Sequence, residues 1–489
     1  MVKLHTSKAV NHTFWNVAGV VLTPALFFIA IPFHINYLGE EQYGLWVFVN
    51  TIIIVLQILN LGLPTSAYKH VAVSIPKRDY AQMQITINTT TSLTLVISLI
   101  GFLGIGALSV GIYHYHWFIH DTTYINILYA CLFVGGFVLT GKLLENVMLN
   151  VFRAFEKFRT VALIMFSFKI ISTVISLIIA YVYHNVFYIL IAISALQLLE
   201  IFYCFWYFKR LVPGYSYKWM LKKHELKHEL KYSLYTWIQS VAVAIVYQSD
   251  RFLVSYIFGF TALTYYSIVA TLFNHIHMGL AALSGWLFPR MAKLKTMNKD
   301  LTATYINIHN ISTAASILLL CLFVLFYRPL FTLWLGAEKL GYMIPFIKWY
   351  TAFQLFFIFT INPYYYLNAI GYERLSTRLV LMFTGFNLAG ILFGYFMLGT
   401  QESFLIGLTV STVIAMFLLL YFLNKRVLKQ YSISQIALML LPSFAGMAMI
   451  FTDNIVWRMV WFLLCMALTY MVYLKNGIHN KTISVWKKG

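Results

Sequence analysis

The stretch VFYILIAISALQLLEIFYCFWYF, residues 186–208, is followed directly by KRLVPGYSYKWMLKKHELKHELK, residues 209–231. The first stretch holds one charged residue, Glu200, and as a helix rising ~1.5 Å per residue it is long enough to cross ~30 Å of hydrocarbon. The second stretch carries seven Lys and Arg residues. An apolar run that ends in a basic segment is typical of a transmembrane helix whose basic end lies in the cytoplasm.

The same pattern recurs along all 489 residues, of which 61% are hydrophobic and 10% charged. The apolar runs predict an all-α polytopic membrane protein with fourteen transmembrane helices. The predicted spans are residues 14–37, 43–64, 84–112, 123–150, 160–183, 186–208, 232–258, 262–287, 304–333, 343–369, 376–398, 402–424, 436–452 and 456–474. The loops between them are short, so no soluble domain is expected.

The basic residues are confined to every second gap between these spans. With the N-terminus inside, and with basic residues near the end of a span counted with the adjoining segment, the inner segments hold 28 of the 35 Lys and Arg residues, the outer segments hold three, and four lie deeper within spans. Because basic loops resist translocation, this distribution predicts that both termini are cytoplasmic. The formal charge of +20 therefore belongs to the inner face, where it suits anionic lipid headgroups and not nucleic acid. Residues 209–231 are expected to form a basic interfacial segment with a short helix.

A short internal repeat suggests two related halves. Glu156-Lys157 is followed by Met165-Phe166, and 217 residues later Glu373-Arg374 is followed at the same spacing by Met382-Phe383. An offset of six helices gives both copies the same orientation in the membrane, as in transporters with parallel halves. We expect a lobe at 1–208, a second lobe at 209–424 that starts with the basic segment, and an added helix pair with a basic tail at 425–489.

Several short motifs, in this order, carry a family resemblance. They are Tyr37-Leu38-Gly39, Gln42-Tyr43-Gly44-Leu45, Leu61-Gly62-Leu63, Lys231-Tyr232-Ser233-Leu234, Ser249-Asp250-Arg251-Phe252, Tyr265-Tyr266 and Phe288-Pro289-Arg290. The chain resembles the Wzx-type flippases, the polysaccharide-biosynthesis branch of the multidrug/oligosaccharidyl-lipid/polysaccharide (MOP) exporter superfamily, which includes the MATE transporters. The resemblance covers essentially the whole chain. It implies a protein of the bacterial cytoplasmic (inner) membrane that moves polyprenyl-pyrophosphate-linked oligosaccharides to the periplasmic leaflet by alternating access of two lobes.

Two departures within the superfamily narrow this expectation. Peptidoglycan-precursor flippases carry arginines in their first two helices, whereas predicted spans one and two here contain no Lys or Arg. Drug exporters of the superfamily usually have twelve helices, so the added pair at 436–474 favours a lipid-linked substrate. The resemblance also makes a polysaccharide polymerase and a chain-length regulator candidate partners, and O-antigen and capsule are both open as the product.

Four basic residues lie inside predicted spans, where a charge costs about 2.5–3.5 kcal/mol on insertion scales. We expect Lys142, Lys169, Arg251 and Lys348 to line a central cationic cavity that binds the pyrophosphate. Each also has a structural interpretation. Lys142 can pair with Glu145 three residues on, Lys169 can extend to the inner interface, and Lys348 can anchor the outer end of its span.

Candidates for proton or sodium coupling are the carboxylates and histidines of the spans: Glu145, Glu200, Asp250, His275 and His277. The histidines are better explained as core residues that bond to neighbouring helices. Pro24, Pro32 and Pro363 interrupt the helical hydrogen-bond pattern and are candidate hinges. The four cysteines are too scattered in sequence for a disulfide framework or a metal cluster, and no metal or cofactor is expected.

Two other functions stay open. A cation-coupled multidrug exporter of the same superfamily would favour an acidic cavity. The predicted spans instead contain four basic residues and three carboxylates, Glu145, Glu200 and Asp250. A membrane-embedded polysaccharide polymerase or ligase needs catalytic residues on a sizeable outer loop, and the chain has no outer loop of that size and no known catalytic motif. We therefore expect a transporter and not an enzyme.

Overall fold

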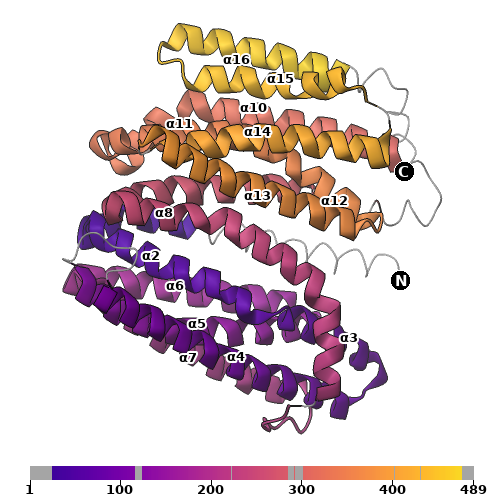
Figure 1. Ribbon diagram of the computed structural model, residues 1–489. Helices are drawn as coiled ribbons and strands as arrows, with labels where there is room; N and C mark the ends of the chain where they lie inside the picture. The colour runs from indigo at the N-terminus through magenta and orange to yellow at the C-terminus, as the bar shows by residue number, and fades with distance from the viewer. Residues whose placement is uncertain are drawn as a thin grey trace. The chain divides into compact units, whose positions relative to one another are not determined.

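The computed structural model describes residues 25–115, 124–221, 223–284, 291, 301–400, 402–429 and 431–475 (Figure 1). Throughout this part of the chain the regular structure is helical, and no strand occurs. The chain divides into two compact units, Met1–Thr264 and Tyr265–Gly489, here called the N-terminal and C-terminal units. The predicted all-α class is confirmed, whereas the lobe boundaries at 208 and 424 stay predictions.

The N-terminal unit is assembled around α5 (Ile125–Ala154). Around it pack α2 (Glu40–Leu56), α3 (Leu63–Lys77), α4 (Tyr80–Tyr115), α6 (Phe158–Tyr183) and α7 (Val186–Leu211). The buried α5 side chains Val147, Val151 and Phe152 belong to a core cluster that extends to α3 and α7. The outer helices show apolar side chains to the surroundings, as expected for helices in lipid.

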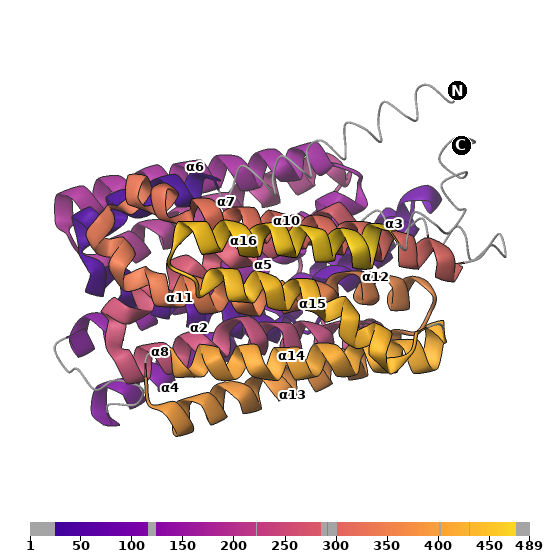
Figure 2. The same cartoon turned by 90° about the horizontal axis from the view of Figure 1, so that it is seen from above.

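The C-terminal unit is assembled around α11 (Ala337–Phe357), which a 3-10 segment at Ile358–Thr360 joins to α12 (Ile361–Ala369). The α11 helix packs against α10 (Leu301–Leu335), α14 (Ser403–Leu423) and α15 (Ile433–Ile450). Two further pairs are closely packed: α13 (Glu373–Leu398) with α14, and α15 with α16 (Ile455–Thr469), which lie side by side in Figures 1 and 2.

The predicted repeat coincides with the same backbone turn in both units. After α5, the amide of Glu156 donates to the carbonyl of Arg153 at 2.9 Å and that of Lys157 to Phe152 at 3.1 Å. After α12, Gly371 donates to Asn368 at 3.3 Å and Tyr372 to Leu367 at 2.8 Å. The residue at the turn has a positive φ in both cases, 58° at Glu156 and 80° at Gly371. This is a helix C-cap with a left-handed residue, which ends α5 at the first copy of the motif and ends α12 just before the second copy.

Twelve helices in the described residues are long and apolar enough to cross a membrane. The predicted first span is described from residue 25 onward, as a shorter apolar helix, Ala25–Leu38. Predicted spans seven and eight both fall within α8 (Lys223–Ser284), where Gly259 interrupts the helix with φ 79° and ψ −177°. A side chain would be strained in that conformation, so glycine permits the break. The count of fourteen spans and the sidedness of the termini stay predictions.

Three segments differ from the expected pattern of spans and plain loops. The inner segment after span two contains the α3 helix, which begins after the left-handed residues Leu61 and Gly62. Span ten is broken between α11 and α12.

The third segment is the predicted short helix in 209–231. Residues 212–221 are not helical, and the helix that starts at Lys223 continues into the following span. The non-helical segment is held to α4 by side-chain bonds, including Asn88 Nδ2 to the Ser216 carbonyl and the Met220 amide to Ser92 Oγ, at 3.1 and 3.2 Å.

Candidate functional site

The best-defined polar cluster inside predicted spans lies between α5 and α7 of the N-terminal unit. Lys142 Nζ and Glu145 Oε2 form an ion pair at 2.5 Å, three residues apart on α5. Gln197 Nε2 of α7 donates to the same Glu145 oxygen at 3.2 Å. Gly141 makes this approach possible, because a Cβ there would lie 2.6 Å from Gln197 Cγ. The pairing of Lys142 with Glu145 that the spacing predicted is therefore present.

Two more predicted residues belong to the same cluster. Glu200, one turn after Gln197 on α7, is buried and lies within electrostatic range of both Glu145 and Lys142. Its Oε1 has no hydrogen-bond partner in the described part of the chain. Lys169, on α6, lies within electrostatic range of Lys142.

The four ionisable groups named here add up to a formal charge of zero when both carboxylates are ionised, and Arg153, at the end of α5 and within electrostatic range of Glu145, adds one positive charge nearby. Lys142 and Lys169 contribute two positive charges, and Glu145 and Glu200 contribute two negative charges. A single proton added to either carboxyl group leaves a net charge of +1. Because two carboxylates close together oppose each other's ionisation, the arrangement is suited to taking up a proton or a small cation.

Arg251 and Asp250 lie apart from this cluster, on α8. Both residues are buried. Arg251 Nη1 donates to Gln248 Oε1 at 3.2 Å, and the Arg251 backbone amide donates to Asp250 Oδ1 at 2.8 Å. Tyr43 of α2 is within electrostatic range of Arg251. The Asp250 carboxylate thus accepts a hydrogen bond from the backbone amide of its neighbour.

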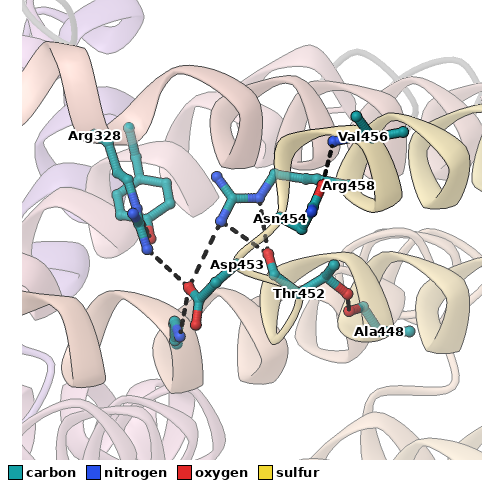
Figure 3. A network of polar contacts seen from close by, with 9 residues as sticks. Arg328, Ala448, Thr452, Asp453, Asn454, Val456 and Arg458 are labelled. Carbon is teal, nitrogen blue, oxygen red and sulfur yellow. Dashed lines mark hydrogen bonds and ion pairs between the residues drawn. The ribbon is translucent and has the colours of Figure 1, made fainter.

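Lys348 belongs to a network in the C-terminal unit. It lies on α11 and forms an ion pair with Asp453 Oδ1 at 3.3 Å (Figure 3). Arg328 of α10 reaches the same oxygen at 2.8 Å, and Arg458 of α16 lies 4.0 Å from it. The hydrogen bond from Lys348, with further help from Arg328 and Arg458, lowers the pKa of Asp453 below its usual value, so this carboxylate is ionised at neutral pH.

The two histidines of predicted span eight differ in their surroundings. His277 is buried. Its Nδ1 lies 2.8 Å from Gln354 Nε2, within hydrogen-bond distance, and its ring stacks on Phe357 with ring centroids 4.3 Å apart. Because the amide nitrogen can only donate, Nδ1 is the acceptor and the ring is neutral in this arrangement. These contacts match the interpretation as a core histidine. His275 is half-buried. A role in ion coupling stays a prediction for both.

The three hinge candidates are placed as follows. Pro24 lies outside the described residues. Pro32 lies within the continuous helix Ala25–Leu38. Pro363 is the third residue of α12, three residues after the 3-10 segment, where its missing N–H costs little because the first turn of a helix has no internal acceptors for its amides. The break itself precedes the proline. Hinge motion stays a prediction at all three positions.

Sequence reasoning missed several partners that the fold supplies. Gln197 was one helical turn from Glu200 in an apolar run, and this spacing was the available signal. Asp453 and Arg458 were outside the candidate set because they fall in or next to a short outer loop. Cys321 and Cys465, two of the cysteines predicted to be too scattered for a disulfide framework or a metal cluster, lie with their Sγ atoms 3.4 Å apart as buried free thiols. Helix packing brings together residues 144 positions apart, which sequence spacing does not reveal.

A bundle of twelve candidate spans with ionisable groups inside its helices defines a multi-pass membrane protein of transporter type. The family model "Polysaccharide biosynthesis protein" matches residues 9–295, more than half of the chain. The chain belongs to this family, and the expected membership is confirmed. Its location as a multi-pass inner-membrane protein also agrees with the spans. A comparison with curated protein sequences gives no match.

Solved structures of MOP superfamily transporters share the fold. An inward-facing multidrug resistance MATE family transporter has a TM-score of 0.65 at 15% identity, over 84% of this chain and 95% of that one. The lipid II flippase MurJ, in an inward closed conformation, has a TM-score of 0.64 at 15% identity, over 97% and 100%. A MOP superfamily transporter from Pyrococcus furiosus scores 0.58 at 15% identity, over 86% and 94%. At this identity the likeness establishes the fold alone.

Proposed function

We propose that the protein is a flippase that moves polyprenyl-pyrophosphate-linked oligosaccharide repeat units from the cytoplasmic to the periplasmic leaflet by alternating access. The observation that carries this proposal is the partly buried cluster of Lys142, Lys169, Glu145 and Glu200 in a chain of the polysaccharide biosynthesis family. Polysaccharide biosynthesis requires that a lipid-linked intermediate crosses the membrane. Ionisable side chains inside membrane spans are energetically costly, so their presence points to a transport path.

The chemistry of the substrate suits this cluster. A pyrophosphate cannot cross the hydrocarbon unaided, and the ammonium groups of Lys142 and Lys169 would replace part of its hydration. Glu145 and Glu200 cancel these charges while both are ionised. Protonation of one carboxyl, or binding of a sodium ion beside it, frees positive charge for the pyrophosphate. This links ion uptake to substrate binding in the same group of residues. Arg251 is proposed as a further cation on the translocation path, and Lys348 as a cation nearer the outer end of that path.

Translocation of a lipid-linked oligosaccharide in reconstituted vesicles tests the proposal. The double substitution Lys169→Ala and Arg251→Ala is expected to reduce translocation at least tenfold, because both remove a charge that balances the pyrophosphate. Arg374→Ala, which removes an exposed inner-face cation at the start of α13, is the matched control and is expected to keep wild-type activity. Protein level and elution profile are measured for each variant. Wild-type translocation by the double variant would overturn the proposal.

A cation-coupled multidrug exporter is the alternative, and the presence of two carboxylates, Glu145 and Glu200, in the same cluster favours it. In that case the carboxylates Glu145 and Glu200, and not the lysines, would bind a cationic drug. Efflux of lipophilic cations from cells that express the protein separates the two. Drug efflux that is lost with Glu200→Gln and kept with Lys169→Ala would favour the exporter. The flippase is expected to complement a strain that lacks its own flippase, and the polymerase and chain-length regulator remain proposed partners of that pathway.

A further inference from the structure

Three basic side chains from three helices converge on one carboxylate in the C-terminal unit. Figure 3 shows Arg328 and Arg458 reaching toward Asp453, and the third cation, Lys348, forms an ion pair with the same carboxylate. All three approach the same oxygen, Oδ1, at 2.8, 3.3 and 4.0 Å. Arg458 is fixed by two hydrogen bonds to the Thr452 carbonyl, at 3.1 and 2.9 Å. We call Arg328, Lys348 and Arg458, with Asp453, the tri-cation cluster.

The tri-cation cluster has a surplus of positive charge. One carboxylate balances one of the three cations, and no second carboxylate of the described residues forms an ion pair with them. The Lys348 and Arg458 side chains are only 18% and 4% exposed, so solvent compensates them poorly. An incompletely balanced group of partly buried charges is costly unless an anion joins it. Arg328 and Asp453 are 43% and 65% exposed, which leaves the cluster accessible from outside the protein.

The position of the cluster points to the interface of the membrane. Its residues lie toward the end of α10, at the middle of α11, in the loop before α16 and at the start of α16, toward the face predicted to be outside. Arg328 and Arg458 lie near the outer ends of predicted spans nine and fourteen, and the predicted outer loops themselves hold one basic residue, Lys339. Concentrating scarce outer cations in one place is the reverse of the usual exclusion of positive charge from outer segments.

An apolar surface begins directly beside the cluster. Ile455, Val456 and Trp457 form the first turn of α16 and are 59–66% exposed. In a membrane protein such side chains contact lipid chains, with the tryptophan at the level of the headgroups. A ligand that meets both surfaces has an anionic head and a hydrocarbon tail. Phosphate is the head that fits, because its several oxygens accept hydrogen bonds from more than one cation at a time.

We propose that the tri-cation cluster binds the phosphate of a lipid at the outer interface, with the acyl or prenyl chain along the exposed face of α16. Asp453 is the internal anion that occupies the cations in the absence of lipid, and it moves aside toward solvent when phosphate arrives. The phosphate has two sources, an outer-leaflet anionic phospholipid or the pyrophosphate of the translocated lipid. The first does not depend on the proposed function and the second rests on it.

Lipid binding to the full-length protein tests this site. The purified protein is titrated with phosphatidylglycerol, with phosphatidylcholine and with undecaprenyl pyrophosphate, and bound lipid is counted by native mass spectrometry. Arg328→Gln is expected to weaken binding of the anionic lipid about fivefold, the usual effect of one basic residue at an anionic membrane surface. Asp453→Asn is expected to retain or strengthen binding because it removes the competing anion. Lys339→Gln changes an outer-segment cation of α11 outside the cluster and is the matched control.

The outcomes separate a lipid site from a purely structural network. If Asp453 only ties α16 to α10 and α11, Asp453→Asn and Arg328→Gln will lower thermal stability alike and leave anionic-lipid binding at the wild-type level, which overturns the proposal. Equal binding of phosphatidylcholine and phosphatidylglycerol also overturns it. A variant that misfolds is replaced by Lys348→Gln, judged by the same measurement. Selective loss of undecaprenyl pyrophosphate identifies the substrate as the source. Selective loss of phosphatidylglycerol identifies a phospholipid site and leaves the flippase proposal to its own translocation assay.

Discussion

Lys142 and Glu145 show how a charge is kept inside a helix bundle. The ion pair is local, between two side chains of one helical face, so it can form as soon as α5 does. The second bond to Glu145, from Gln197, needs α7 to be in place. The Lys142 side chain is 40% exposed and Glu145 12%, so the carboxylate depends more on its partners than the ammonium does.

At this scale we predict that Lys142→Met costs more stability than the double substitution Lys142→Met and Glu145→Leu. The single change leaves Glu145 beside Glu200 without its cation, which is expected to cost about 1–2 kcal/mol at this partial exposure. The double change removes both charges and fills the space with apolar atoms. Thermal midpoints of the purified proteins in one detergent measure the difference. A double variant less stable than the single one would show that the charges are held by other groups.

Single residues of this cluster were predictable because their cost in the membrane marks them in the sequence. The pair Lys142 and Glu145 followed from spacing alone. The convergence of Glu200 and Lys169 on that pair depends on how α6 and α7 pack on α5, and no local pattern specifies it. Asp453 was harder still, since an acidic residue in a short loop is ordinary until its fold neighbours are known.

At the scale of elements, small residues decide how closely helices approach. Gly390 and Gly394 on α13 face Gly407 on α14, and a Cβ at Gly407 would lie 1.9 Å from the Gly390 carbonyl oxygen. A Cβ at Gly394 would lie 2.1 Å from the Ser403 carbonyl oxygen. Two glycines four residues apart are a known means of bringing membrane helices into backbone contact. The α13–α14 pair is therefore held by packing that tolerates no added methyl group.

Gly407→Ala is expected to destabilise the protein by about 1–3 kcal/mol, the typical cost of overpacking, because the atom in the way is backbone. Gly385→Ala, on α13 with no atom within 4 Å of its added Cβ, is the matched control and should be neutral or slightly stabilising through its helix propensity. Thermal unfolding of both variants in the same detergent gives the comparison. Equal midpoints for the two would contradict the close approach of α13 and α14.

Most elements could be predicted because an apolar run of sufficient length has one stable state in a bilayer, the helix. Interruptions inside such runs were less accessible. Gly259 and the 3-10 segment at Ile358–Thr360 carry little signal, since glycines and β-branched residues are common in spans. The non-helical segment 212–221 depends on Asn88 and Ser92 of α4, which are distant in sequence and supply its hydrogen bonds.

At the scale of the whole molecule, transport requires that ion and substrate affect each other's binding. The charge of the N-terminal cluster offers a direct route, because Glu145 and Glu200 together cancel Lys142 and Lys169. Any ion that neutralises Glu200 raises the net charge seen by a pyrophosphate by one unit. A coupling of this kind is reciprocal, so substrate binding must also favour uptake of the ion. In the proposed site both ligands meet the same four groups, so the proposed coupling needs no signal over a distance.

Glu200→Gln replaces the carboxyl group by a neutral amide and so imitates its protonated form. We predict that this variant still translocates lipid-linked oligosaccharide down its own gradient, but no longer responds to an imposed proton or sodium gradient that accelerates the wild type. The reason is that the variant carries the net charge of +1 permanently. Glu156→Gln, an exposed acid in the turn after α5, is the matched control and should keep the wild-type response. Vesicles with and without each ion gradient provide the measurement. A Glu200→Gln variant whose rate still follows one of the gradients would place the coupling site elsewhere, with Asp250 as the next carboxylate to test.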